Sequence, residues 1–352
     1  MKKVSIIKLL APQNDLITQP LQKWTWRRED QLASTSEAIN WSNLKAVSED
    51  RGHPQAVPFA WESNMPLRSS LCYELTISQS SNFENPLILR NLSEPKTKVR
   101  YLYIATRYFW KVAAICSGRR VAVSPVWSFI TNSTPPRWIT VPGITNVRDM
   151  GGWPLPGNRM VRQGVIYRGS EMNDHVEITE DGKEIFIRKL GIHTDLDLRA
   201  ESASRVLDEQ AVQWINIPIA PYEHICEETY KKRYCQIFEI FADASNYPIF
   251  FHCWGGADRG GSLAFLLGAL LGMSMNDLIQ DYELTSLSIW GVRSRESDEF
   301  KKLLGALDEF GSDKDTINEK VERYLRDAGL SETHIAQIRE QCVVSALADS
   351  KD

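Results

Sequence analysis

A cysteine and an arginine stand six positions apart in a glycine-containing segment, where together they could hold and attack a phosphate group. Cys253 and Arg259 enclose Trp254, Gly255, Gly256, Ala257 and Asp258. The apolar residues 248–251 before this segment predict a buried strand, and residues 262–271 after it predict a buried helix. A strand, a loop and a helix in this order direct backbone N–H groups and the positive helix end at one point, which favours an anion there.

Each residue type in this loop has a chemical reason to be there. A helix N-terminus and a nearby cation favour the thiolate form of a cysteine, so we expect Cys253 to be a nucleophile. Arg259 offers a planar, permanently charged fork for two phosphoryl oxygens. We expect Gly255 and Gly256 to adopt positive φ values, so that the backbone amides of residues 254–259 line an anion-binding nest. The pattern predicts covalent catalysis through a phosphocysteine, which water then hydrolyses.

Four segments in order resemble the motifs of the bacterial branch of the protein tyrosine phosphatase superfamily. Residues 252–261 are similar to its HCxxGxDR[ST]G loop, and residues 145–152 to its NxRDxGG motif. Residues 164–170 resemble its GxxYRS segment, and residues 190–202 resemble its LGIxTxxDLR strand and turn. The resemblance implies an α/β phosphatase domain over residues 139–345, with a central mostly parallel sheet flanked by helices.

The proton donor is the least constrained part of the predicted site. Asp258 is the acid nearest in sequence to the nucleophile Cys253, and it matches the motif of the branch, so it is the favoured general acid. In other branches of the superfamily the acid lies on a separate upstream loop. The corresponding segment here offers Glu223, Glu227 and Glu228, and these alternatives stay open.

Further residues from the matched motifs are predicted to support the loop. They are His252, Asn146, Arg148, Asp149, Asp197 and Arg199. We expect His252 to fix the loop geometry by hydrogen bonding, and Arg148 and Asp149 to form a buried pair. Asp197 is expected either to stabilise a turn or to lie near the pocket.

Two positions depart from the branch. Gly260 stands where the branch has a Ser or Thr whose hydroxyl helps the cysteine to leave, so we expect slow breakdown of the phosphoenzyme. Ala257 stands where some relatives have a Lys that favours highly charged lipid head groups, which argues against phosphoinositides. The predicted function is therefore a cysteine-dependent phosphomonoester hydrolase, most simply a protein tyrosine or dual-specificity phosphatase, with neither a metal nor an organic cofactor.

Other functions use the same residue types. A lipid or inositol phosphate phosphatase would keep the chemistry with a different pocket, and Gly260 also suggests a weakly active phosphopeptide-binding module. A sulfurtransferase places a cysteine in a similar anion-holding loop, but Arg259 and Asp258 favour phosphorus. The expected partner is a phosphorylated protein or a small phosphomonoester.

Short alternating runs in the first part of the chain predict a separate all-β domain. Strands are expected at residues 57–62, 72–78, 107–114 and 124–131. The pattern resembles an immunoglobulin or fibronectin type III sandwich over residues 20–132, with a core that contains Trp61, Trp110 and Trp127. We expect this domain to position a protein partner or to shield the catalytic mouth rather than to perform chemistry.

The remaining segments complete the expected domain plan. Residues 1–19 are predicted to be an N-terminal extension, residues 133–138 a stiff linker and residues 346–352 a C-terminal tail. Helices are expected at residues 275–287, 298–310, 315–325 and 331–343, with their apolar faces against the sheet.

Composition limits the compartment and the partners. The net charge of −4 over 352 residues gives no basic excess for nucleic acid or an anionic membrane. The six cysteines lack the spacing of a metal site, although a Cys72–Cys116 disulfide stays open. The N-terminus begins like a signal peptide, but Lys8 interrupts its apolar run, and no run of residues is long enough to span a membrane. We expect a cytoplasmic protein, or an exported one if a leader was removed.

Overall fold

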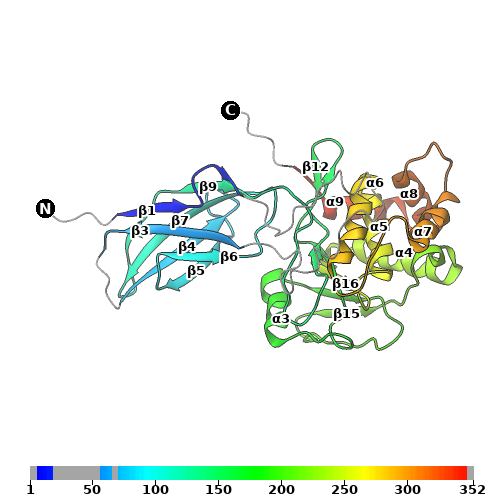
Figure 1. The fold of residues 1–352 in the computed structure, drawn as a ribbon, viewed down its shortest axis with the longest axis horizontal. Helices are drawn as coiled ribbons and strands as arrows, with labels where there is room; N and C mark the ends of the chain where they lie inside the picture. Colours follow the sequence, from blue (N-terminus) through cyan, green and yellow to red (C-terminus); the bar gives the residue numbers. More distant parts are fainter. Residues whose placement is uncertain (1–5, 19–55, 66–69, 347–352) are drawn as a thin grey trace. The chain divides into compact units, whose positions relative to one another are not determined.

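The computed structural model describes residues 6–18, 56–65 and 70–346, and these residues divide into two compact units (Figure 1). Among the described residues, the first unit ends at Thr134 and the second begins at Pro135. The first unit is built from strands, whereas the second combines strands and helices. Each unit has its own apolar core.

The first unit contains two sheets that share one core. The smaller sheet has the order β1 (Ile7–Ala11), β3 (Val57–Ser63) and β6 (Lys96–Val99). The larger sheet has the order β2 (Leu16–Ile17), β9 (Trp127–Ile130), β7 (Arg107–Cys116), β4 (Leu71–Ser78) and β5 (Leu87–Leu92), and β8 (Arg119–Val123) also pairs with β7. Phe59 of the smaller sheet meets Trp110 of the larger sheet edge to face, with ring centroids 5.1 Å apart. The predicted strands are therefore present, and the likeness to fibronectin type III stays a prediction.

The structure corrects the predicted limits of this unit. Residues 1–19 are not an extension throughout, because β1 pairs with β3 and β2 pairs with β9. The predicted domain start at residue 20 lies outside the described residues. Arg137 and Trp138 of the predicted linker are buried in the second unit, where Trp138 forms a bridge with Arg148. Of the predicted tail, residues 347–352 are outside the described residues.

The disulfide that the sequence left open is not formed. Cys72 and Cys116 are both free. Cys72 lies opposite Ile115, and Cys116 lies opposite Leu71 on the paired strands. Because successive side chains alternate between the faces of a sheet, the two sulfur atoms point to opposite faces and cannot meet.

The second unit is organised around a five-stranded sheet. Its order is β10 (Arg148–Asp149), β13 (Ile166–Gly169), β16 (Ile249–His252), β14 (Thr194–Asp197) and β15 (Gln213–Asn216). The β13–β16, β16–β14 and β14–β15 pairings are parallel, and only β10 runs antiparallel to its neighbour in this sheet. The prediction of a central, mostly parallel sheet is confirmed. A small second sheet joins β11 (Pro154–Leu155), β12 (Arg159–Val161) and β17 (Val343–Ser345).

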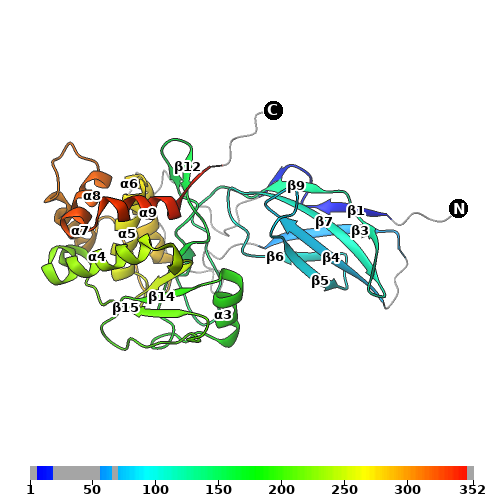
Figure 2. The same ribbon diagram turned by 180° about the vertical axis from the view of Figure 1, so that it is seen from behind.

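Helices flank this sheet, as Figures 1 and 2 show from opposite sides. They are α3 (Glu180–Glu184), which continues into η3 (Ile185–Leu190), then α4 (Glu228–Ala242), α5 (Arg259–Leu271), α6 (Met275–Leu284), α7 (Asp298–Asp308), α8 (Ile317–Asp327) and α9 (Glu332–Cys342). The short turns η4 (Tyr222–Cys226), η5 (Ala244–Asn246) and η6 (Thr285–Leu287) connect them. No helix within the described ranges is long and apolar enough to pass through a membrane.

Strand β16 and helix α5 form the centre of the second unit. Ile249 and Phe251 of β16 belong to the same apolar cluster as the helices, whereas Phe250 packs on Phe186 of η3, with ring centroids 4.7 Å apart. Every residue of α5 after Arg259 is buried. The predicted strand, the predicted helix after it and the four predicted C-terminal helices are confirmed, and the loop between β16 and α5 is fixed at both ends.

Candidate active site

The Cys253–Arg259 segment connects the end of β16 to the first residue of α5. Cys253 directly follows the last residue of the strand and has only 3% of its surface exposed. Asp258 is the N-cap residue of α5, and Arg259 is its first helical residue. The free N–H groups and the positive end of a buried helix therefore lie where the sequence predicted an anion site.

The two glycines of the loop are required for different reasons. Gly256 has a φ of 63°, and a Cβ atom on it would lie 2.2 Å from the carbonyl oxygen of Gly169. The positive φ predicted for Gly255 is wrong, since Gly255 is absent from the positive-φ residues among those described. A Cβ on Gly255 would instead lie 2.6 Å from Cγ of Trp290. One glycine therefore permits the turn, and the other permits the close approach of an indole ring.

Side chains from the matched motifs bind the backbone of this loop. Asn146 donates from Nδ2 to the carbonyl oxygen of Gly255 at 2.9 Å. Arg168 donates from Nη2 to the carbonyl oxygen of Gly256 at 2.6 Å. Arg148 donates from Nη1 to Oδ1 of Asn146 at 2.6 Å. These bonds anchor the carbonyl oxygens of Gly255 and Gly256, and the loop amides stay the predicted lining of an anion site.

A buried aspartate balances the arginines beneath the loop. Asp281 of α6 accepts hydrogen bonds from Nε of Arg148 at 2.9 Å and from Nη1 of Arg168. Burial alone would raise the pKa of Asp281, but the two arginines outweigh burial and lower it. The predicted pair of Arg148 with Asp149 is wrong, because consecutive strand residues point to opposite faces. Asp149 instead binds Nη2 of Arg137 at 2.6 Å.

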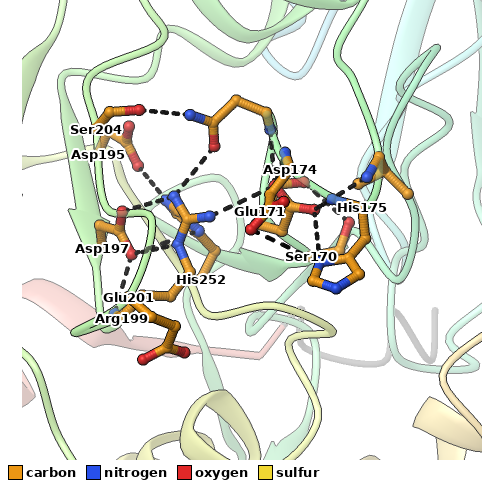
Figure 3. Close-up of polar contacts among 12 residues, drawn as sticks. Ser170, Glu171, Asp174, His175, Asp195, Asp197, Arg199, Glu201, Ser204 and His252 are labelled. Carbon is orange, nitrogen blue, oxygen red and sulfur yellow. Dashed lines mark hydrogen bonds and ion pairs between the residues drawn. The ribbon is translucent and has the colours of Figure 1, made fainter.

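His252 contacts the neighbouring strand next to the loop (Figure 3). Its Nε2 atom lies 3.1 Å from Oδ1 of Asp195, and its Nδ1 atom lies 4.0 Å from Oδ1 of Asp197. Burial would lower the pKa of His252, but these two carboxylates outweigh burial and raise it. Asp197 also accepts bonds from Nε and Nη2 of Arg199 at 2.9 and 2.8 Å. Oδ1 of Asp197 further accepts the backbone N–H of Arg199 at 3.0 Å, the contact of a turn-stabilising residue, which is one of the two roles that the sequence left open.

An aromatic wall stands beside the loop. The ring of His175 lies 4.7 Å from that of Trp254 and 5.9 Å from that of Trp290, centroid to centroid. Glu171 is buried and accepts four backbone N–H bonds, from residues 173–176 (Figure 3). Its own N–H donates to the carbonyl oxygen of Trp254 at 2.9 Å. Glu171 therefore holds the segment that carries His175 against the catalytic loop, a role that no sequence motif indicated.

Arg259 pairs with a carboxylate that sequence reasoning did not assign. Its Nη2 atom lies 2.7 Å from Oε1 of Glu201, and its guanidinium carbon lies 5.7 Å from the Trp254 ring centroid. Burial lowers the pKa of Arg259, but the bond to Glu201 and the charge of Cys253 raise it, and the net shift is upward. Glu201 follows the matched DLR motif by two residues, and that position was the only signal for it.

Asp258 is held by two residues that are distant in sequence. Arg293 donates from Nε at 2.9 Å to Oδ1 and from Nη2 at 3.0 Å to Oδ2 of Asp258. The hydroxyl of Tyr222 also bonds to Oδ1. Neither Arg293 nor Tyr222 belonged to a recognised motif, so the sequence pattern did not indicate either of them.

The alternative acids form ion pairs elsewhere. Glu223 bonds to Lys302 at 2.9 Å, and Glu228 bonds to Lys232 at 2.9 Å with both side chains exposed. Glu227 pairs with His224 three positions before it. Asp258 remains the acid of the loop itself, although its role as proton donor stays a prediction.

The assembled groups suit the capture of a tetrahedral oxyanion. A sulfur atom, an arginine and a helix N-terminus meet in a loop that buried side chains hold, and a carboxyl group stands at its end. In the described ranges, His, Cys, Asp and Glu side chains nowhere gather in a group of three that could hold a metal ion.

Comparisons with known proteins agree with this chemistry. A model described as the tyrosine phosphatase family matches residues 139–344, more than half of the chain. A Cupriavidus necator protein named "Putative tyrosine-protein phosphatase" is 28% identical over 166 residues, covering 40% of this chain and 59% of that relative. This chain therefore spans less than two thirds of the relative's length.

Two solved structures are more distantly similar. The core catalytic domain of the PP-IP phosphatase SIW14 from S. cerevisiae is 17% identical, with a TM-score of 0.30, over 45% of this chain and 96% of that one. An Fn3-like protein from Clostridium thermocellum is 16% identical, with a TM-score of 0.19, over 23% of this chain and 81% of that one. Both likenesses are too distant to carry an argument.

Proposed function

The chain belongs to the tyrosine phosphatase family, and on that premise we propose that it hydrolyses phosphate monoesters through a phosphocysteine formed on Cys253. The observation that carries the proposal is the junction of β16 and α5. There Cys253 directly follows the strand and Arg259 is the first residue of the helix, so the sulfur and the guanidinium lie at the two ends of one short loop at a helix N-terminus. A cysteine in such surroundings is suited to covalent attack on phosphorus.

The chemistry divides into two displacements at phosphorus. In the first, the Cys253 thiolate forms the S–P bond, the ester O–P bond breaks, and the departing oxygen takes a proton from Asp258. In the second, water attacks phosphorus, the S–P bond breaks, and one water proton goes to Asp258 while the thiolate re-forms. Arg259 and the loop amides stabilise the charge on the phosphoryl oxygens in both steps.

We propose phosphotyrosine as the preferred substrate because of the wall beside the loop. Trp254, His175 and Trp290 present aromatic rings there, and such rings favour an aromatic leaving group through edge and stacking contacts. The side chain of His175 is 46% exposed, so it can meet a ligand.

The charges around the loop favour a single phosphate over a polyphosphate. Arg259 already pairs with Glu201, and Arg293 already pairs with Asp258. Ala257, where a lysine would add charge, is buried and neutral. A substrate with many phosphate groups would need cations that are not already neutralised in this way.

The test compares substrates and variants of the purified full chain without added metal. We expect turnover of p-nitrophenyl phosphate and of tyrosine-phosphorylated peptides, none by Cys253→Ser, and vanadate binding by both proteins. Undiminished turnover by the variant would remove Cys253 from its assigned role, and failure of vanadate to bind would contradict an anion site at this buried sulfur. Faster turnover of inositol phosphates would favour the alternative substrate class, and binding of phosphopeptides without phosphate release would favour a binding module.

A further inference from the structure

We propose that Arg293 and Tyr222 are positioning residues, which fix the carboxyl group of Asp258 for proton transfer. This inference rests on the proposed function. Arg293 holds both carboxyl oxygens, from Nε to Oδ1 at 2.9 Å and from Nη2 to Oδ2 at 3.0 Å. The Tyr222 hydroxyl donates to Oδ1 as well. A planar fork and a third donor leave the carboxyl group one orientation, although 44% of the Asp258 side chain is exposed.

Arg293 is itself held in place by the turn that carries it. Its backbone N–H donates to Oγ of Ser286 at 2.8 Å, and the Ser286 hydroxyl donates back to its carbonyl oxygen at 3.0 Å. Its Nη1 atom donates to the carbonyl oxygens of Trp290 at 3.2 Å and Val292 at 3.1 Å. The same turn places Trp290 against Gly255 of the catalytic loop. The guanidinium is therefore a rigid element and not a surface side chain that meets Asp258 by chance.

Tyr222 reaches Asp258 from a backbone conformation that tyrosine rarely adopts. Its φ is 62°, and its N–H donates to the buried hydroxyl of Ser262 in α5 at 3.0 Å. Its hydroxyl also lies 3.2 Å from that of Tyr282. Burial is the largest cause that raises the pKa of Tyr222, and the nearby Tyr282 and Asp258 raise it further. The phenol therefore keeps its proton and can donate a hydrogen bond. Strained backbone of this kind persists where surrounding contacts over-determine it, as happens at functional sites.

The groups that face Asp258 are the arginines Arg293 and Arg259 and the phenols Tyr222 and Tyr282. None of the four can replace Asp258 as a proton donor at neutral pH, because the pKa values of all four are raised above their ordinary values. Of the four, only Arg293 and Tyr222 bond to Asp258, and their role is then to orient its carboxyl group toward the departing ester oxygen. Misplacing a general acid matters most when the leaving group is a strong base.

The experiment uses leaving groups that differ in their need for a proton. Phenolate is a much stronger base than p-nitrophenolate, so phenyl phosphate needs the acid and p-nitrophenyl phosphate needs it little. We expect Arg293→Met to lower kcat/KM for phenyl phosphate by roughly 10- to 100-fold, within the range of general acid catalysis, and to change that for p-nitrophenyl phosphate by less than about threefold. Arg293→Lys, which keeps the charge but loses the fork, should fall between these results.

Two further variants keep the test independent of whether Arg293→Met folds. Tyr222→Phe removes only the hydroxyl and should lower kcat/KM for phenyl phosphate by roughly 2- to 10-fold, as expected for one hydrogen bond to the neutral carboxyl group. In a protein that already carries Asp258→Asn, neither Arg293→Met nor Tyr222→Phe should further change the ratio of kcat/KM for phenyl phosphate to kcat/KM for p-nitrophenyl phosphate.

The results separate this inference from the function on which it rests. If the Arg293 and Tyr222 variants lose the same fraction of kcat/KM on both substrates, or if their effects add fully to that of Asp258→Asn, these residues have only a structural role. The inference is then overturned, whereas the proposed phosphatase activity is not. If Asp258→Asn leaves the substrate ratio unchanged, the acid lies elsewhere, and the inference fails alone. Absence of any turnover by the unmodified protein would instead overturn the proposed function.

Discussion

Gly260 gives a sharp test of how the phosphocysteine breaks down. The proposed second step releases the Cys253 thiolate from phosphorus, and a hydroxyl donor next to the sulfur would stabilise that charge as it forms. A Cβ atom built on Gly260 lies 3.8 Å from Sγ of Cys253 and 4.0 Å from Cε2 of Phe251, which are ordinary contacts. Serine therefore fits at this position, and its hydroxyl, one bond beyond Cβ, can reach the sulfur.

The size of the effect follows from the bond that would be added. A hydrogen bond to a charged group contributes about 1.5–3 kcal/mol. If the bond forms fully in the transition state, Gly260→Ser should speed phosphoenzyme breakdown by roughly 10- to 150-fold. Gly260→Ala is the matched control, because it adds the same Cβ atom but no hydroxyl.

Rapid-mixing kinetics with p-nitrophenyl phosphate measure this step. The unmodified protein and Gly260→Ala should both release a burst of about one nitrophenolate per active site, followed by slow turnover. In Gly260→Ser the burst should shrink and the steady rate should rise. Equal steady rates in the Ser and Ala variants would refute the reasoning, and so would the absence of a burst in the unmodified protein.

Three other predictions concern the charges around the loop. Asp281→Asn should lower the free energy of unfolding by about 3–5 kcal/mol in urea titrations, because it leaves two buried arginines without their counter-charge; a loss below 1 kcal/mol would contradict the buried network. Glu201→Gln should lower the inhibition constant of phosphate about two- to fivefold, since phosphate no longer competes with this exposed carboxylate for Arg259, and an unchanged constant would argue against that competition. Asp195 and Asp197 raise the pKa of His252, so the stability that protonated His252 gains from Asp195 is fully present below about pH 6.5 and is lost as pH rises through the folded pKa. Asp195→Asn should therefore weaken the pH dependence of the free energy of unfolding in urea titrations. The same pH dependence in the variant and the unmodified protein would exclude the His252–Asp195 pair as its source.

The sequence predicted the parts of the site that are contiguous in the chain. Cys253 and Arg259 stand in one short segment between two strongly apolar runs, so local pattern was sufficient to expect a strand, an anion-binding turn and a helix. The hydrogen-bond and ion-pair partners of these residues were harder to predict, since successive side chains of a strand point to opposite faces of the sheet. Arg148 and Asp149 were expected to pair, yet each finds its counter-charge on a different side of the sheet.

The motifs along the chain by themselves indicated the family and the candidate nucleophile, because both depend on residue types at fixed local spacing, and the mostly parallel sheet followed from the resemblance to that family. Only the tertiary structure brought Glu201 to Arg259, Tyr222 and Arg293 to Asp258, and Trp290 to Gly255. These contacts join segments that no periodicity relates. Their formation depends on how helices pack around β16, and packing is decided by the whole core at once.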